Sequence, residues 1–194
     1  MLSYLAATLP DNASPSARLL ALQCALRADD TLHVRLPRGV LRGLRLDAPE
    51  PWRDLERAHW LHIATPNASR QITVRLLDTA LPGQEPARPD RRRAADWALR
   101  AGNPSRTGVG GPLQQLIVTC LAAHTDTSGN GWSEPGRMAR GCGLSPGQLP
   151  DLLDQLTAAG MLAAWRGCPY SEDLHWKLRP ASGLQVIEGC GGMR

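Results

Sequence analysis

The chain contains no phenylalanine, and Lys177 is the one lysine among its 22 basic residues, the others being arginine. Such a bias is typical of GC-rich coding, so the preference for arginine carries no functional meaning by itself. No run of 18 apolar residues and no charged-then-apolar leader is present, and we therefore expect no membrane span and no secretory signal. A glycine-rich loop ending in Lys-Ser or Lys-Thr is also missing, which argues against a nucleotide-hydrolysing site of that type.

The five cysteines are odd in number and include no closely spaced pair. This usage suits a reducing cytoplasm better than a disulfide-stabilised secreted protein. Cys24 and Cys120 fall on the apolar faces of expected helices, so we interpret them as small core residues. The histidines and the remaining cysteines lack the spacing of zinc ligands, and we expect no metal and no other cofactor.

The segment 139–162 is the most informative part of the sequence. Gly143 permits the positive φ of a tight turn, and Ser145 is a suitable N-cap for the helix that follows. Pro150 removes a backbone hydrogen bond early in that helix, so we expect the regular helix to begin near Leu149. Its leucines recur at helical spacing, at positions 149, 152, 153 and 156. A short helix, a tight turn and a second amphipathic helix together predict a helix-turn-helix.

The flanking segments extend this prediction to a whole domain. A helix over 112–124 comes first, and Trp132 falls in a short strand before the helix-turn-helix. Segments 161–165 and 174–178 have the length and composition of two strands joined by a turn-rich stretch. A helix-turn-helix followed by a β-hairpin is a winged helix, which we assign to residues 109–180.

The first half of the chain contains a weak repeat of the same pattern. Residues 17–26 predict an amphipathic helix, residues 31–36 predict a strand, and residues 42–47 align with 140–145. A hairpin is expected from strands near 62–64 and 71–77. Because a repeat changes the whole fold assignment, we assign residues 1–81 to a second, winged-helix-like domain.

Residues 82–108 form a connector of different composition. Prolines open it, and Asp90 then caps a helical run that extends to Arg100. Because Trp97 needs a place to bury, we expect this helix to be docked on the protein. Residues 87–108 hold six arginines and two acidic residues, whereas basic and acidic residues nearly cancel on either side of them. A basic stripe of this kind is the expected footprint of a phosphate-binding surface.

Together these features predict a mainly α fold with small β-hairpin wings (α+β). Two winged-helix domains are joined by the Arg-rich helical connector and followed by a glycine-rich tail, residues 181–194. The two domains have the size of units that bury a core.

The expected partner is double-stranded DNA. In the C-terminal domain the leucines take the core face of the second helix and leave Asp151 and Asp154 outward, where phosphates repel them. The N-terminal domain has more cations around its second helix, so we expect this domain and the connector to hold the DNA. The residues predicted to contact DNA are Arg38, Arg42, Arg45, Arg53, Arg57, Arg70, Arg75, Arg91, Arg92, Arg93, Arg137, Arg140, Gln148 and Gln155.

Residues 139–162 and the hairpin after them resemble the winged-helix superfamily of bacterial regulators. The resemblance is strong over 109–180 and faint over 17–78, and it is closest in type to the tandem winged-helix proteins of actinobacteria. It implies that the helix over 146–159 enters the major groove and that the wing at 167–173 meets the DNA backbone.

The sequence therefore favours a cytoplasmic, nucleoid-associated transcriptional regulator without catalytic residues. Residues 143–147 match the G-x-S-x-G pattern of hydrolases, but a helix, not a strand, precedes Ser145, so we do not expect an enzyme. Two alternatives remain open: a replication or partition initiator of a plasmid-like mobile element, and a non-enzymatic scaffold whose winged helices bind protein, through the C-terminal domain above all. A homodimer, formed through the N-terminal arm or the Trp97 helix, is also left open.

Overall fold

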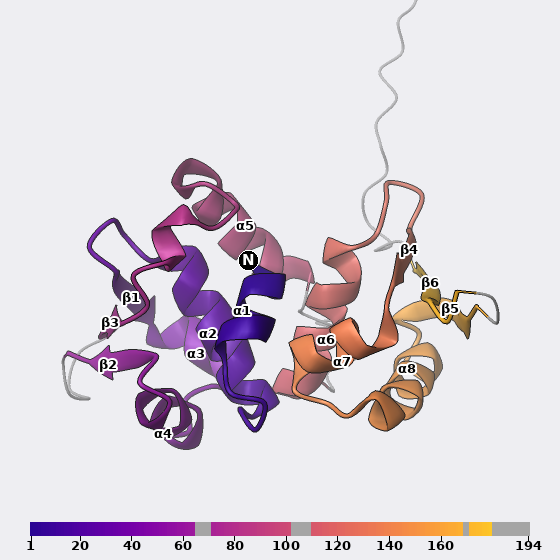
Figure 1. The fold of residues 1–194 in the computed structure, drawn as a ribbon, viewed down its shortest axis with the longest axis horizontal. Helices are drawn as coiled ribbons and strands as arrows, with labels where there is room; N and C mark the ends of the chain where they lie inside the picture. The colour runs from indigo at the N-terminus through magenta and orange to yellow at the C-terminus, as the bar shows by residue number, and fades with distance from the viewer. Residues whose placement is uncertain (65–70, 102–109, 169–170, 180–194) are drawn as a thin grey trace, which may run out of the picture.

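The computed structural model describes residues 1–64, 71–101, 110–168 and 171–179. They form a mixed α+β protein with two small antiparallel sheets of three strands each. The sheets lie at opposite ends of the molecule, and helices fill the space between them (Figure 1). None of the described helices combines the length and the apolar character that crossing a membrane requires.

The N-terminal half is built around one long buried helix, α2. Ser14 caps this helix, because its hydroxyl oxygen accepts from the backbone N–H of Ala17 at 3.2 Å, and Pro15 fits the first helical position. The elements of this half are α1 (Leu2–Thr8), α2 (Pro15–Arg27), β1 (His33–Pro37), α3 (Arg38–Gly43), α4 (Glu50–Arg57), β2 (Leu61–Ile63) and β3 (Gln71–Leu76).

A short 3-10 turn, η1 (Leu81–Gly83), and helix α5 (Arg88–Ala101) connect the two halves. The elements of the C-terminal half are α6 (Pro112–Ala123), β4 (Asn130–Ser133), α7 (Pro135–Cys142), η2 (Pro146–Gln148), α8 (Leu149–Ala158), β5 (Leu162–Gly167) and β6 (Leu174–Leu178). The predicted helix over 112–124 and the predicted strands near 161–165 and 174–178 are thus confirmed.

The two halves have the same order of elements, and their sheets have the same order of strands. In each sheet the third strand lies between the first and the second, giving β1-β3-β2 and β4-β6-β5. All neighbouring strands are antiparallel. In each half a helix precedes the first strand and two helices separate it from the hairpin, as the weak sequence repeat predicts.

The turn between α7 and α8 follows the chemistry expected from the sequence. Gly143 ends α7 with a φ of 69°, a left-handed conformation that glycine adopts without strain. The backbone N–H and the hydroxyl of Ser145 both donate to the side-chain oxygen of Gln148, at 2.9 and 3.0 Å. Regular helix begins at Leu149, next to Pro150, as predicted.

One continuous apolar core extends through both halves. Helix α2 packs against α4, α5 and α6, and α1 packs against α7. Cys24 and Cys120 are both buried, as expected of small core residues. Helix α5 is docked as predicted, but it uses Ala95 and Ala98 for this contact, whereas Trp97 remains 38% exposed.

A buried arginine lies where the two halves meet. Arg18 is 3% exposed, and its guanidinium donates to the carbonyls of Pro10 and Ala13 at 2.8 and 3.2 Å. Burial lowers the pKa of this guanidinium from its ordinary value. The Arg18 side chain also lies against Gly143, since a Cβ atom at that glycine would come within 2.8 Å of the Arg18 Nε. Arg18 thus fastens the segment before α2 to the turn before α8.

Candidate nucleic-acid interface

Helix α4 has one buried side and one solvent-exposed side. Trp52 and Leu55 are buried, and the indole Nε1 of Trp52 donates to the Leu46 carbonyl at 3.2 Å. Residues four positions apart lie on the same face of a helix, so Arg53 and Arg57, which are both exposed, project from the same side. Helix α4 therefore presents two cations one turn apart.

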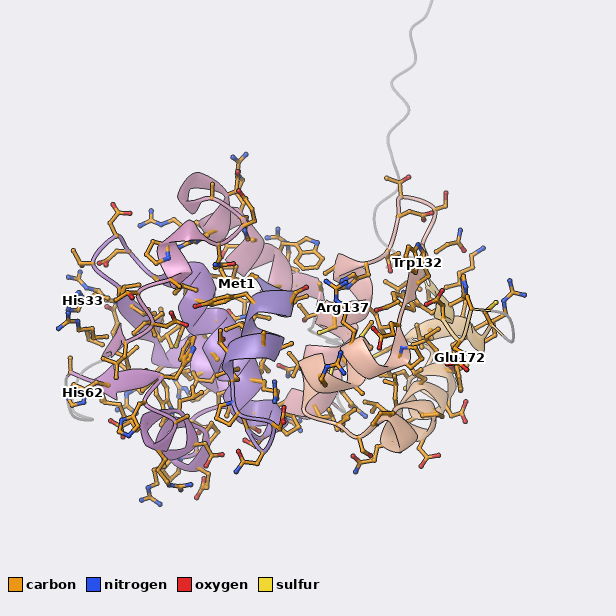
Figure 2. All side chains as sticks on the ribbon, in the orientation of Figure 1. Met1, His33, His62, Trp132, Arg137 and Glu172 are labelled. Atoms are coloured by element: carbon orange, nitrogen blue, oxygen red, sulfur yellow. The ribbon has the colours of Figure 1, made fainter. Side chains whose placement is uncertain are left out.

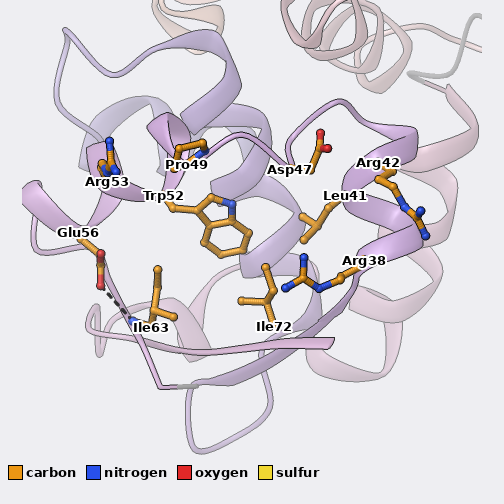
Figure 3. A pocket seen from close by; sticks show the side chains of 10 residues that line it. All are labelled: Arg38, Leu41, Arg42, Asp47, Pro49, Trp52, Arg53, Glu56, Ile63 and Ile72. Carbon is orange, nitrogen blue, oxygen red and sulfur yellow. Dashed lines mark hydrogen bonds between the residues drawn. The ribbon is translucent and has the colours of Figure 1, made fainter. Parts of the chain in front are cut away.

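A groove of about 740 Å³ lies beside α4, between α3, α4 and the strands β2 and β3. Its floor is apolar: the ring of Trp52 occupies the centre, and the side chains of Leu41, Ile63 and Ile72 surround it (Figure 3). Because α4, α3 and the two strands converge on this floor, cations from different elements share one concave surface.

Charged side chains form the rim of the groove. Arg38, Arg42 and Arg53 carry three positive charges, and Asp47 and Glu56 carry two negative ones. Glu56 is already engaged within the protein, since its Oε1 accepts from the Ile63 backbone N–H at 3.3 Å, as the dashed line in Figure 3 marks. The rim therefore offers an anion more donors than acceptors.

Six of the predicted DNA contacts are exposed arginines. Within the described part of the chain none of the six takes part in an ion pair. Arg38 is half-buried at the groove, and Gln155 is exposed on α8. Arg70 lies outside the described residues. The six exposed arginines are Arg42, Arg45, Arg53, Arg75, Arg92 and Arg140.

Arg91 does not belong to this interface, which corrects the sequence-based prediction. Its side chain is 4% exposed, and its guanidinium donates to the carbonyls of Leu81, Pro82, Gln84 and Pro86, each at 2.9 Å. These four backbone carbonyl oxygens accept the hydrogen bonds that we expected Arg91 to donate to an external anion. Arg91 therefore holds the η1 turn against α5 and presents no donor to a phosphate.

Four other predicted contacts are exposed but already have partners. Arg93 pairs with Asp90 at 2.6 Å, and Arg57 pairs with Asp54 at 3.2 Å. The arginine of each pair is largely solvent-exposed, and surface pairs contribute little stability, so a phosphate can replace the carboxylate. Arg137 donates to the Ser3 hydroxyl at 2.6 Å, which joins α7 to α1. The side-chain oxygen of Gln148 serves the Ser145 cap.

Helix α8 differs from α4 in the charge of its exposed side. Asp151 and Asp154 are both exposed, and the described residues of α8 include no cation. Asp154 also accepts from the Trp165 indole Nε1 at 2.8 Å, which joins the helix to β5. The exposed side of α8 therefore repels phosphates, as the sequence predicts.

Sequence reasoning selected Arg75 but missed the rest of the outer faces of the two sheets. His33, Arg75 and His62 form one cross-strand row in the first sheet, and Trp132, His175 and Arg166 form one in the second. His33 and His62 lie at one end of the molecule and Trp132 at the other (Figure 2). The signal was present in the period-two alternation of the strands, which puts every second residue on one face.

Among the described residues no group of three or more histidine, cysteine or acidic side chains is placed to hold a metal ion. Comparison of the chain with protein-family models, with curated proteins and with solved structures finds no match in any of the three.

Proposed function

We propose that the protein is a double-stranded DNA-binding protein, a transcriptional regulator in which each half is a winged helix. The repeated order of helix, strand, two helices and hairpin supports this proposal, and so does the shared strand order of the two sheets. In winged helices the second helix of the helix-turn-helix enters the major groove. That helix is α4 in the first half and α8 in the second.

The N-terminal half provides the main DNA contact in this proposal. The observation that carries it is the pair of exposed arginines, Arg53 and Arg57, on the outer side of α4 beside the arginine-rimmed groove. Arginine reads guanine edges in the major groove and also contacts phosphates. Arg42 and Arg45 precede α4 and are exposed, so they are suited to the flanking backbone.

The connector and the C-terminal half have smaller roles. With Arg91 buried, Arg92 and Arg93 are the remaining exposed cations at the start of α5. Helix α8 exposes aspartates, so we propose that it stays out of the groove. The C-terminal half then contacts DNA only weakly, through other residues, or binds a protein. No group of residues in this proposal acts as a catalyst.

A salt titration tests the N-terminal interface. We expect Arg53→Ala/Arg57→Ala to weaken duplex binding and to reduce the slope of log K against log salt concentration by about 2, because each lost phosphate contact removes about 0.9. The matched control is Arg100→Ala, which removes an exposed arginine at the far end of α5. Equal slopes for the double variant and the control would rule out α4 as the contact.

Two further results distinguish the alternatives. Footprints on a palindromic promoter site support a regulator, whereas tandem sites at an origin support a replication or partition initiator of a mobile element. Failure of the full chain to bind any duplex at low salt overturns the proposal and favours a protein-binding scaffold, since nonspecific affinity is strongest under that condition.

A further inference from the structure

The C-terminal sheet has an open outer face that the duplex-binding proposal does not use. Strand pairing places Trp132, His175 and Arg166 in one cross-strand row and Asn130, Lys177 and Ala164 in the next. Residues of β6 at 174 and 176 point to the opposite side and are buried. We call these six residues, Asn130, Trp132, Ala164, Arg166, His175 and Lys177, the outer sheet face.

Trp132 is the most exposed large apolar side chain among the described residues, at 64%. The two other tryptophans of this sheet donate hydrogen bonds within the protein: Trp176 to the Thr125 hydroxyl and Trp165 to the Asp154 carboxylate. Trp132 has no such bond within the described residues. Gly131 explains its direction, because Trp176 packs so closely on that glycine that a Cβ there would come within 2.4 Å of the Trp176 ring. The Trp132 ring therefore points to solvent.

A shallow depression of about 320 Å³ lies on the same sheet. It forms where Ala164 contributes only a methyl group between the longer side chains of Arg166 and Lys177. His175 and Asn130 complete the polar part of its wall. A planar aromatic ring thus shares its row with one cation of the hollow, Arg166, and lies one row away from the other, Lys177.

The charge of the outer sheet face is of one sign. Arg166 and Lys177 are both exposed, and neither is ion-paired within the described part of the chain. The nearest acids in sequence are Asp126, whose Oδ1 accepts from the Asn130 backbone N–H at 2.9 Å, Glu134, after β4, and Glu172 and Asp173, in the turn between β5 and β6; all four lie outside the two rows. The face is therefore complementary to a polyanion.

We propose that this face binds single-stranded nucleic acid, with a base stacked on Trp132 and phosphates held by Arg166 and Lys177. Bases in a duplex are stacked on one another and cannot cover an indole ring, whereas an unpaired base has a free face. An acidic peptide would satisfy the cations, but it offers a planar group only where it carries an aromatic residue, whereas every nucleotide carries a planar base. Aromatic rings beside a cationic surface are the usual components of single-strand recognition.

The inference goes beyond duplex binding and does not depend on it. Helix α4 and the outer sheet face lie at opposite ends of the molecule (Figure 1), so one chain could hold a duplex and an unpaired strand at the same time. Such an arrangement suits DNA that is partly melted.

Fluorescence anisotropy with a labelled oligothymidine of about 20 nucleotides tests the proposal. At about 50 mM salt we expect Trp132→Ala to weaken binding about ten-fold and Trp132→Phe to retain most of the affinity. Arg166→Ala/Lys177→Ala should lower the salt slope by about 1.4, at about 0.7 for each phosphate of a single strand. The matched controls are Trp97→Ala, another exposed tryptophan, and Arg100→Ala, and both should leave binding unchanged.

Cross-comparison with a duplex separates this proposal from the duplex-binding one. We expect Arg53→Ala/Arg57→Ala to weaken duplex binding and spare oligothymidine, and Trp132→Ala to do the reverse. If the duplex does not bind but oligothymidine binding still needs Trp132, the single-strand site stands alone. Equal affinity of Trp132→Ala and Trp97→Ala for oligothymidine overturns it. The proposal is also overturned if Trp132→Ala weakens the binding of poly-glutamate as much as that of oligothymidine, because poly-glutamate has no base to stack on the ring.

Discussion

The two halves of the molecule use the same unusual backbone conformations but different residues. Apart from Glu172, in the turn between β5 and β6, the positive φ angles of the described residues occur at Leu32, Arg45 and His59 in the first half and at Gly129, Gly143 and Gly160 in the second. The members of each pair occupy corresponding places: Leu32 and Gly129 precede the first strand, Arg45 and Gly143 precede the second helix of the turn, and His59 and Gly160 precede the hairpin. The repeat thus reaches the level of single dihedral angles.

Glycine adopts a positive φ without cost, whereas other L residues pay about 1–2 kcal/mol for it. The N-terminal half has non-glycine residues at all three of these positions and is therefore strained there. Two of the three, Arg45 and His59, are exposed. Residues with strained backbone cluster at functional sites. The difference between the halves agrees with the assignment of the main duplex contact to the N-terminal one.

The side chains on the shared framework have diverged in opposite directions. Helix α4 presents Arg53 and Arg57, and helix α8 presents Asp151 and Asp154. The sheets are both basic outside, but only the second adds an exposed indole, Trp132. One backbone plan therefore supports two surfaces of different chemistry.

The largest expected effect comes from removing a glycine that the junction requires. A Cβ at Gly143 would lie 2.8 Å from the Arg18 Nε and 2.9 Å from the Ala13 carbonyl oxygen, at a φ of 69°. Backbone strain and overpacking together should make Gly143→Ala lower the free energy of unfolding by about 2–4 kcal/mol in urea denaturation. Gly160→Ala is the matched control, because its nearest neighbour is Arg179 Nη1 at 3.7 Å, and it should cost only about 1 kcal/mol. Equal losses would show that Arg18 does not constrain the turn.

Alkaline pH should destabilise both halves through one buried thiol in each. Burial raises the pKa of Cys24 to about 12, and the neighbouring Cys120 thiol, 3.9 Å away, together with burial raises the pKa of Cys142. Above a pH of about 9 the unfolded thiols lose protons that the folded ones keep, so stability falls as pH rises. The loss should approach about 1.4 kcal/mol per pH unit for each thiol.

Chemical denaturation between pH 8.5 and 10 measures this slope, a range chosen from the ordinary thiol and tyrosine pKa values of about 8.5 and 10. Cys24→Ala should remove about half of the slope, and Cys24→Ala/Cys142→Ala should remove most of it. A full slope in the double variant would assign the alkaline loss to other groups.

A smaller change, a gain in the free energy of unfolding, is expected when Arg45 is replaced by glycine, the residue found at the corresponding position, Gly143, of the second half. Arg45 is exposed at a φ of 56°, so Arg45→Gly relieves the strain and loses no buried contact. After the greater freedom of glycine in the unfolded chain is taken into account, we expect a stabilisation of about 1 kcal/mol. Arg42→Gly, at an exposed position inside helix α3, should instead destabilise by about 1 kcal/mol. A loss of stability in Arg45→Gly would contradict the equivalence of the two turns.

The local parts of the fold could be predicted because local chemistry decides them. Gly143, Ser145 and Pro150 fix the turn and the start of α8 through φ preference, capping and a missing N–H, all of which depend on neighbours in sequence. Leucine spacing likewise indicates which side of α8 is buried.

The residues that the sequence analysis missed or assigned wrongly owe their positions to contacts with residues distant in the sequence, or to which face of a strand or helix is buried. Arg91 is buried because the carbonyls of 81–86 happen to surround its guanidinium, and a run of arginines gives no sign of this. Trp132 was expected in a strand, but its face is set by the packing of Trp176 on Gly131, 45 positions apart in the chain. Trp97 was expected to bury, yet two alanines dock α5 in its place.

The smallest expected effect tests whether α8 stays out of the DNA groove. Asp154→Asn removes one negative charge but keeps a side-chain oxygen that accepts from the Trp165 indole, at 2.8 Å in the native protein. If α8 is remote from the duplex, screening over more than about 10 Å leaves duplex affinity unchanged within about two-fold at 0.1 M salt. If α8 lies beside phosphates, the lost repulsion should strengthen binding several-fold and more so at low salt. Arg53→Ala, at the corresponding side of α4, should weaken duplex binding under the same conditions. An affinity gain in Asp154→Asn would show that α8, like α4, lies beside the DNA phosphates.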